Sequence, residues 1–250
     1  MIRSVTHAPT KAWHHAHKRR AKHATILVLT LIIIAAILAI AGYFAGVGWH
    51  DLAEALALST YRLAGGYVIG LLLGAGIALL VGWSPFTNLL FPVLDVLQNL
   101  PSFALLPIFF LLFGYTNLMI ILFTADGIMW PILFAVLTAI KTAHQDLNDA
   151  ATIFGACGLR RIGAYLIPLS LPAIITGSIV GLAIGWETVI GAEIIGQMAG
   201  IGGFISKAGA LGVSPALFAG MLGILAVVFA LNRLLWAPLL SDSEKHYGTE

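Results

Sequence analysis

Charge and cysteine are both scarce in this sequence. Of its 250 residues only 10% are charged, against about 25% in an ordinary soluble domain. Cys157 is the single cysteine, which excludes an internal disulfide, and no cluster of cysteines and histidines has the spacing of a metal site. The sequence also contains no Gly-Lys-Ser or Gly-Lys-Thr, which excludes a phosphate-binding loop with its lysine. We therefore expect no catalytic residues, no cofactor and no metal.

Hydrophobic residues, by contrast, make up 60% of the chain and form long runs without charge. These runs cover residues 63–94, 96–125, 162–186 and 208–232. About 20 consecutive apolar residues suffice to cross a bilayer as a helix, whereas the strands of a membrane β-barrel would alternate apolar and polar residues. The sequence predicts an all-α, polytopic bundle of membrane helices.

Glycines, prolines and the rare charges divide these runs into about six spans. We expect the spans at residues 25–43, 61–81, 92–113, 118–140, 168–190 and 215–236. The stretch 191–209, "GAEIIGQMAGIGGFISKAG", is too rich in glycine for a span and is interpreted as a re-entrant or interfacial piece.

The basic residues predict the orientation, because lysine and arginine are enriched in the cytoplasmic loops of membrane proteins. Six of the thirteen precede the first span, and six crossings place five more on the same side: Lys141, Arg160, Arg161, Arg233 and Lys245. Only Arg62 and Lys207 remain near the other side. Both termini are therefore predicted to be cytoplasmic, in a multi-pass protein of the cell membrane.

The N-terminal head leaves two alternatives open. Its basic residues and the apolar stretch 26–41 resemble a signal peptide, but the stretch is longer than a typical signal core, so an uncleaved span is favoured. Five of the eight histidines lie in the head. They indicate either a solvated tail beside the membrane, the simpler interpretation, or a metal-binding tail.

Two predicted spans carry glycine at every fourth position, namely Gly66, Gly70 and Gly74 in the second and Gly177, Gly181 and Gly185 in the fifth. This spacing lets another helix approach closely. We favour packing within one subunit, with a face toward a pore or a second subunit as the alternative.

Residues 140–166 form the longest polar interruption on the predicted cytoplasmic side. Asp146 or Asn148 is a plausible helix N-cap, residues 150–154 offer a short apolar face, and Gly155 suits a left-handed helix stop. A second short helix is expected over 157–165, followed by Pro168 in the first turn of the next span. From the residues alone, the segment is either a surface loop with arginines on lipid headgroups or a docking site for another protein.

The same segment resembles the cytoplasmic "EAA" signature of permease subunits of bacterial-type ATP-binding cassette (ABC) importers. That signature is Glu-Ala-Ala, three residues, Gly, nine residues and Ile-x-Leu-Pro; here it reads Asp149, Ala150, Ala151, Gly155, Tyr165, Ile167 and Pro168. Asp, Tyr and Ile replace Glu, Ile and Leu. "LQNLPSFALLPIFFLLFG" and "GWETVIGAEIIGQMAGIGGFI" are similar to stretches of the nitrate/sulfonate/taurine-type permeases.

The resemblance implies a type I ABC importer permease over about residues 58–238. The predicted layout is a basic head at 1–24, a first span with an outer loop at 25–57, a permease core at 58–238 with a coupling segment at 140–166, and a tail at 239–250. The implied partners are two ATP-binding subunits, a second permease subunit, a solute-binding protein and the bilayer, with no nucleic acid. The residues implied to contact the ATP-binding subunits are Asp149, Ala150, Ala151, Gly155, Gly158, Arg160, Arg161 and Pro168.

Charged residues inside the membrane are functional candidates by default, because burying them in lipid is costly. Asp126, Glu187, Glu193 and Arg62 are the candidates for the substrate pathway, whereas Asp95 is expected near the cytoplasmic end of its span, pairing locally. For Glu193, accepting hydrogen bonds from the glycine-rich loop is favoured over contact with substrate. Arg62 is expected to pair with an acid or to reach headgroups.

The sequence thus favours the permease of an ATP-driven importer, not itself an enzyme, for a nitrate-, sulfonate- or taurine-like solute or another small organic one. A proton-coupled secondary transporter using Asp126 and Glu187 is the alternative, but no inverted repeat is evident. A structural subunit without transport activity is a third.

Overall fold

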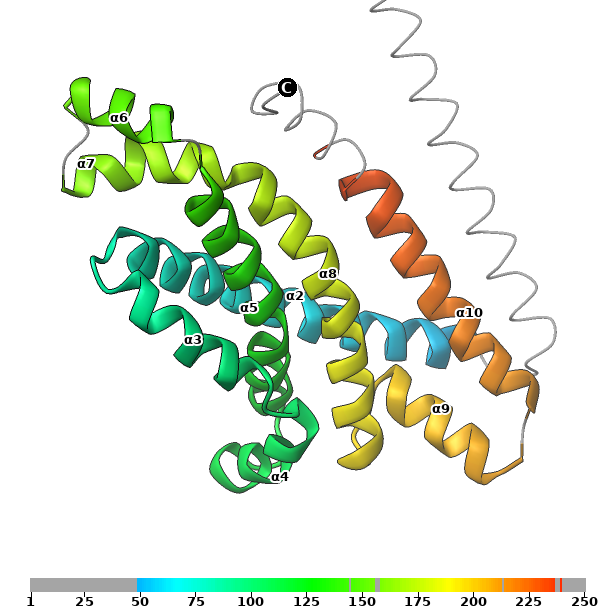
Figure 1. Cartoon of the computed structure of the whole chain (residues 1–250). Coiled ribbons are helices and arrows are strands. Elements are labelled where there is room, and N and C mark those ends of the chain that lie inside the picture. Colours follow the sequence, from blue (N-terminus) through cyan, green and yellow to red (C-terminus); the bar gives the residue numbers. More distant parts are fainter. Residues whose placement is uncertain (1–48, 144, 156–157, 213, 237–238, 240–250) are drawn as a thin grey trace, which may run out of the picture.

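The computed structural model describes residues 49–143, 145–155, 158–212, 214–236 and 239. The predicted first span, the head and the tail beyond residue 239 lie outside the described residues. Within the described part every regular element is a helix (Figure 1), which confirms the all-α prediction. In chain order the elements are α2 (Trp49–Trp83), α3 (Thr87–Gln98), α4 (Ser102–Phe113), α5 (Asn117–Thr142), α6 (Gln145–Ile153), α7 (Leu159–Arg161), the π-helix η1 (Ile162–Leu166), α8 (Ile167–Ile195), α9 (Ile201–Ala210), α10 (Ser214–Leu231) and the π-helix η2 (Asn232–Trp236).

Four helical stretches of the described part are long and apolar enough to cross a membrane: His50–Trp83, Asn117–Thr142, Ile162–Ile195 and Pro215–Leu234. They match the second, fourth, fifth and sixth predicted spans. The second span is longer than predicted, since α2 begins at Trp49 and not at residue 61. Residues 49–57, expected in an outer loop, therefore belong to α2.

The third predicted span is not one helix. Residues 92–113 are divided between α3 and α4, which meet at an angle of 83°. Pro101 explains the break, because a proline disfavours the helical conformation of the residue before it and its ring clashes with the preceding turn. Pro101 itself is extended (φ −66°, ψ 116°) and α4 begins directly after it. Together the two helices form a broken span or a re-entrant loop.

α5 occupies the middle of the bundle and packs chiefly against α2 and α8. Its core residues include Phe123, Ile128, Ile132 and Leu133, all fully buried. The glycines of α2 lie against one side of α5, where a Cβ on Gly74 would come within 2.5 Å of the Met129 carbonyl oxygen. On α8, a Cβ on Gly177 would lie 2.8 Å from Ile132 Cα. Packing within one subunit, the favoured interpretation of both glycine rows, is confirmed.

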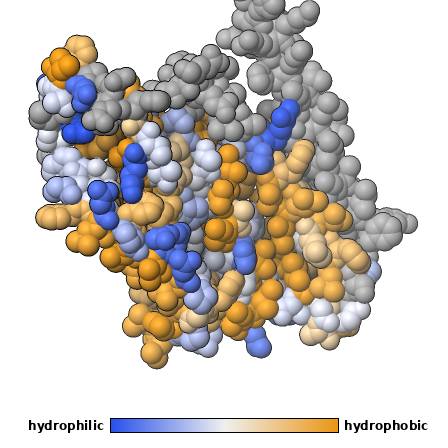
Figure 2. All heavy atoms as spheres, in the orientation of Figure 1, coloured by the Kyte–Doolittle hydropathy of each residue, from blue (hydrophilic) through white to orange (hydrophobic). Residues whose placement is uncertain are grey.

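The surface is mostly apolar, as a protein surrounded by lipid requires. Figure 2 shows hydrophobic side chains over much of the visible face, with hydrophilic ones at the upper left, where Figure 1 places α6 and α7, and in patches that continue into the middle of the face. α9 lies toward the opposite end of the molecule in Figure 1. Most of the sequence-predicted site residues are divided between these two ends.

Candidate functional site

The first candidate site is the α6–α7 segment, residues 145–161. α5 ends at Thr142, Ala143 is extended (ψ 134°), and a helix resumes already at Gln145. Asp146 and Asn148 were predicted as N-caps, but both lie inside α6. That prediction was wrong because the turn between α5 and α6 is shorter than the sequence suggests.

α6 ends at the predicted place. Gly155 has a φ of +73° and its N–H donates to the Thr152 carbonyl oxygen at 3.0 Å, which confirms the left-handed stop. Gly158 also has a positive φ, +58°. Two left-handed glycines three residues apart turn the chain sharply between α6 and α7.

The second short helix, predicted over 157–165, is not a separate element. α7 begins at Leu159 and continues through η1 directly into α8 (Figure 1). Pro168 lies at the start of α8, and its missing N–H removes one ordinary helical bond. The widened π-turn immediately before it, closed by the Ile167 N–H to the Ile162 carbonyl, accommodates that loss. α7 is therefore the first turn of the long helix that crosses the membrane.

Several side chains of the α6–α7 segment are exposed. Ile153 and Phe154, beside Gly155, are 82% and 84% exposed, and Asp149, Gly158 and Arg160 are exposed as well. Arg161 is half-buried, with its guanidinium 5.9 Å from the centre of the Tyr165 ring. Exposed apolar side chains and an exposed arginine on one short segment form a surface suited to a protein partner.

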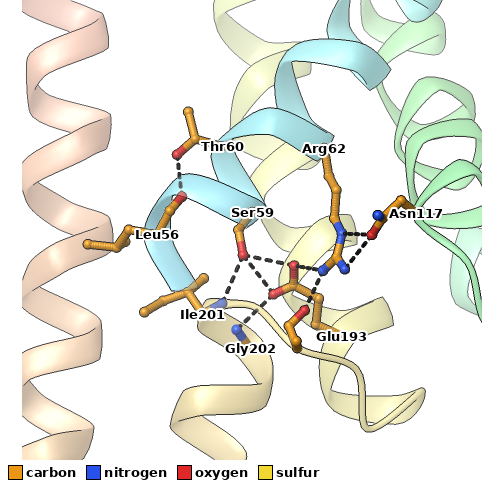
Figure 3. Close-up of polar contacts among 9 residues, drawn as sticks. Leu56, Ser59, Thr60, Arg62, Asn117, Glu193, Ile201 and Gly202 are labelled. Carbon is orange, nitrogen blue, oxygen red and sulfur yellow. Dashed lines mark hydrogen bonds and ion pairs between the residues drawn. The ribbon is translucent and has the colours of Figure 1, made fainter. Parts of the chain in front are cut away.

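The second candidate site is a buried ionic cluster made by Ser59, Arg62, Asn117 and Glu193 (Figure 3). Ser59 and Arg62 project from α2 toward Glu193 on α8, and all three are buried. Arg62 Nη1 lies 2.5 Å from Glu193 Oε1 and also donates to the Ala199 carbonyl. Its Nε and Nη2 donate to Asn117 Oδ1, at the start of α5, at 3.0 and 2.7 Å.

The same carboxylate holds the loop that precedes α9. Glu193 Oε2 accepts from the Gly202 N–H at 2.9 Å, and Ser59 Oγ, which donates to Glu193, accepts from the Ile201 N–H at 2.8 Å. Gly200 lies so close that a Cβ there would fall 2.2 Å from Glu193 Oε1, and its φ is +135°. The glycines of this stretch thus let the backbone wrap around a buried carboxylate.

This geometry bears out two expectations from the sequence, the pairing of Arg62 with an acid and the loop hydrogen bond to Glu193. Ser59 and Asn117 were not anticipated, since a serine and an asparagine at helix positions carry no signal. A buried arginine requires hydrogen-bond acceptors, so Arg62 itself was the only sign in the sequence that polar partners lie nearby.

The other two acidic candidates lie elsewhere. Asp126 is half-buried on α5, one helical turn before Trp130. Glu187 is exposed on α8 and points away from the buried Gly177, Gly181 and Gly185, as helical spacing predicts. Asp95 is exposed on α3 and accepts from its neighbour Gln98 at 2.7 Å, which confirms the expected local pairing.

Comparison with known proteins identifies the family. Residues 66–235 match the sequence model described as "Binding-protein-dependent transport system inner membrane component". The chain belongs to this family. It is an ABC importer permease of the nitrate/sulfonate/taurine type, a multi-pass protein of the inner membrane. Permeases of this family work with ATP-binding subunits and a solute-binding protein, and the family is one of transport proteins and not of enzymes.

Three relatives illustrate the range of the family. The putative aliphatic sulfonates transport permease protein SsuC of Bacillus subtilis (strain 168) is 32% identical over 198 residues, 77% of this chain and 71% of its own length. The taurine transport system permease protein TauC of Escherichia coli (strain K12) is 28% identical, over 76% of this chain and 68% of its own. The nitrate import permease protein NrtB of Leptolyngbya laminosa is 27% identical, over 76% and 70%.

Proposed function

We propose that this permease forms the translocation pathway of an ATP-driven importer together with a second permease subunit, identical or closely related. Two ATP-binding subunits supply the energy, and a solute-binding protein delivers the solute. The chain itself contains no phosphate-binding loop, so hydrolysis of ATP belongs to the partners. A proton-coupled secondary transporter, the alternative from the sequence, is not favoured by the family.

The solute we propose is a small sulfonate, taurine or nitrate, or another small organic solute. The support comes from the relatives, whose names specify aliphatic sulfonates, taurine and nitrate. For the pathway residues, we propose that Asp126 and Glu187 face the solute or the second subunit. For Arg62 and Glu193 we propose a supporting position at the end of the pathway, because each is already the other's partner.

The α6–α7 segment is the proposed contact with an ATP-binding subunit, with Asp149, Ala150, Ala151, Gly155, Gly158, Arg160, Arg161 and Pro168 forming or shaping it. The observation that carries this proposal is the exposed pair Ile153 and Phe154 beside the left-handed Gly155. Apolar side chains with this exposure, outside the predicted spans and next to a basic residue, need a protein partner to cover them.

The proposed orientation follows from the same segment. An ATP-binding subunit lies in the cytoplasm, so the α6–α7 end is cytoplasmic. Lys141, Arg160 and Arg161 lie at that end, as the preference of basic residues for the cytoplasmic side requires. α9, with Lys207, then lies toward the outer side, where the solute-binding protein docks. Both termini are cytoplasmic in this proposal.

Two matched substitutions test the contact. Phe154 and Leu111 are both 84% exposed, but Leu111 lies on α4, outside the α6–α7 segment. Phe154→Ala should weaken retention of the ATP-binding subunits about tenfold, as expected for the loss of about 1.4 kcal/mol at an interface. Leu111→Ala should leave it unchanged. The measurement is the amount of ATP-binding subunit that copurifies with the permease. Equal retention by both variants would contradict the proposed contact.

A further inference from the structure

We infer that Ser59, Arg62, Asn117 and Glu193 are positioning residues that link the α9 end of the permease to the α6–α7 segment. In this inference the buried ionic cluster fixes the loop before α9 to α8. A push on that loop by the solute-binding protein then displaces α8, and with it α7. The inference rests on the proposed function, in which the solute-binding protein acts at one end and the ATP-binding subunits at the other.

The cluster connects three helices with the loop before α9 and with α9 itself. Ser59 and Arg62 come from α2, Asn117 from the start of α5, Glu193 from α8, and the backbone of Ala199, Ile201 and Gly202 from the loop and α9 (Figure 3). Since the charged groups are buried, water does not compete for these bonds. The loop therefore moves together with α2 near Ser59 and Arg62, the start of α5 and the end of α8.

The loop has little freedom to move separately from Glu193. The Met198 N–H donates to the Glu193 carbonyl at 2.9 Å, and the Gly202 N–H donates to its carboxylate. Neither Gly200 nor Gly202 has room for a Cβ, because Gly200 lies against the carboxylate and Gly202 against the Ile190 carbonyl and the Glu193 Cβ. The backbone carbonyl and the carboxylate of Glu193 thus hold the two ends of the loop, one at Met198 and the other at Gly202.

α8 provides the connection to the other end. The helix is continuous from Ile162 to Ile195, 34 residues, or about 50 Å at 1.5 Å per residue. Glu193 lies in its last turn, and Arg160 and Arg161 of α7 directly precede its first. One unbroken helix therefore carries the ionic cluster at one end and the α6–α7 segment at the other.

The loop is also accessible to a partner. A hollow of about 220 Å³ lies between the first turns of α2 and the loop with α9, and its lining includes Asp51, Glu54, Gly200, Gly203 and Lys207. A protein segment that enters the hollow meets charged side chains of both signs and presses on the backbone that the cluster holds. Contact from outside is thereby transferred to the buried residues.

The test requires variants that remain folded. Removing only one charge would leave the other buried and unpaired, which destabilises strongly, whereas neutralising both is often tolerated. The first variant is Arg62→Met with Glu193→Gln, because a glutamine still accepts from Ser59 and Gly202. The second is Asn117→Ala, since Asn117 is exposed and only its bonds to Arg62 are lost. Asn99→Ala is the control, as the Asn99 side-chain amide donates to the Asp95 backbone carbonyl of the adjoining α3, away from the cluster.

The experiment uses the complete complex in lipid vesicles, with the solute-binding protein loaded with taurine, ethanesulfonate or nitrate, whichever stimulates the unmodified complex. Copurified ATP-binding subunits and basal ATP hydrolysis report on the α6–α7 contact. Stimulation of hydrolysis by the loaded solute-binding protein reports on the link. We expect both cluster variants to retain the ATP-binding subunits and the basal ATP hydrolysis. The stimulation of hydrolysis by the loaded solute-binding protein should fall about fivefold or more, the low end of the range by which one site changes the affinity of another. Asn99→Ala should behave as the unmodified complex.

Unchanged stimulation in Asn117→Ala and in the double variant would overturn the inference. If the double variant does not fold, Asn117→Ala decides alone. Loss of the ATP-binding subunits from the unmodified permease would instead reject the proposed function, so the two failures are distinguishable.

Discussion

At the scale of single residues, backbone conformation at the α6–α7 turn matters more than packing. Gly155 and Gly158 both have a positive φ, and a Cβ on either would meet no atom within 4 Å. Neither glycine is therefore required for space. What each provides is a left-handed conformation, which costs an ordinary residue about 1–2 kcal/mol. The direction in which Ile153 and Phe154 project depends on that conformation.

Gly155→Val should consequently leave the protein in the membrane but weaken its hold on the ATP-binding subunits, by about fivefold to thirtyfold if the full 1–2 kcal/mol of strain is relieved by reorienting the turn. Gly163→Val is the matched control, because Gly163 of η1 also has open space around it but is not among the glycines with a positive φ. Copurification of the ATP-binding subunits and transport measure the effect. Normal values of both in Gly155→Val would show that the turn does not position the contact.

The buried ionic cluster shows how far single residues could be predicted. A glutamate beside a glycine-rich loop indicated hydrogen bonds from that loop, because a buried carboxylate needs donors. Its partner Arg62 lies 131 positions away in the sequence, and no periodic pattern relates the two. Pairings of this kind follow from the packing of α2 against α8, which only the three-dimensional structure supplies.

At the scale of elements, the bundle depends on glycine faces on both sides of α5. Gly70 and Gly74 of α2, and Gly177 and Gly181 of α8, all lie within van der Waals reach of the α5 backbone or its isoleucines. In a bilayer there is little hydrophobic gain when helices associate, so close van der Waals packing of this kind stabilises the bundle.

Substitutions at two glycines of α2 distinguish the effect of close packing on stability from the effect of helix propensity. A Cβ on Gly74 would lie 2.5 Å from the Met129 carbonyl oxygen, whereas a Cβ on Gly76 would meet nothing within 4 Å. Gly74→Ala should destabilise by about 1–3 kcal/mol through overpacking. Gly76→Ala should be neutral or stabilise by up to about 1 kcal/mol, since alanine favours a helix more than glycine does. Thermal unfolding in detergent, followed by tryptophan fluorescence, measures both. A similar midpoint for the two variants would contradict the assigned packing.

The sequence predicted element boundaries correctly where hydrophobicity determines them. The predictions were wrong where local backbone chemistry determines the boundary. Four of the predicted spans coincide with long helices because each run is apolar enough to require a membrane environment. The run 92–113 satisfied the same criterion, yet Pro101 divides it into α3 and α4. Pro168 lies in the first turn of α8 as predicted, but the expected break before it is missing, because η1 continues the helix from α7 into α8.

At the scale of the whole molecule, one face of α8 is left uncovered by the described part of the chain. Exposed residues recur along it with helical spacing, opposite the buried glycines: Thr176, Val180, Ala183, Glu187 and Ile194. A carboxylate facing lipid at depth costs about 2.5–3.5 kcal/mol even on the more lenient scales. An importer built from two permease subunits offers a different environment, either their interface or the pathway between them.

Glu187→Gln tests that placement, because glutamine keeps the shape and hydrogen bonding of the side chain and removes its charge. If the face adjoins the pathway or the second subunit, transport should change about tenfold, equivalent to 1.4 kcal/mol on the barrier, or ATP hydrolysis should respond less to the solute-binding protein. Expression should not change, since the exposed Glu187 makes no packing contact that the substitution removes. Asp95→Asn is the control, as that exposed carboxylate pairs within its own helix and its substitution should affect neither measurement. Normal transport together with normal stimulation of ATP hydrolysis in Glu187→Gln would show that this face contacts neither the pathway nor the second subunit. Glu187 would then be a tolerated polar residue near the membrane edge.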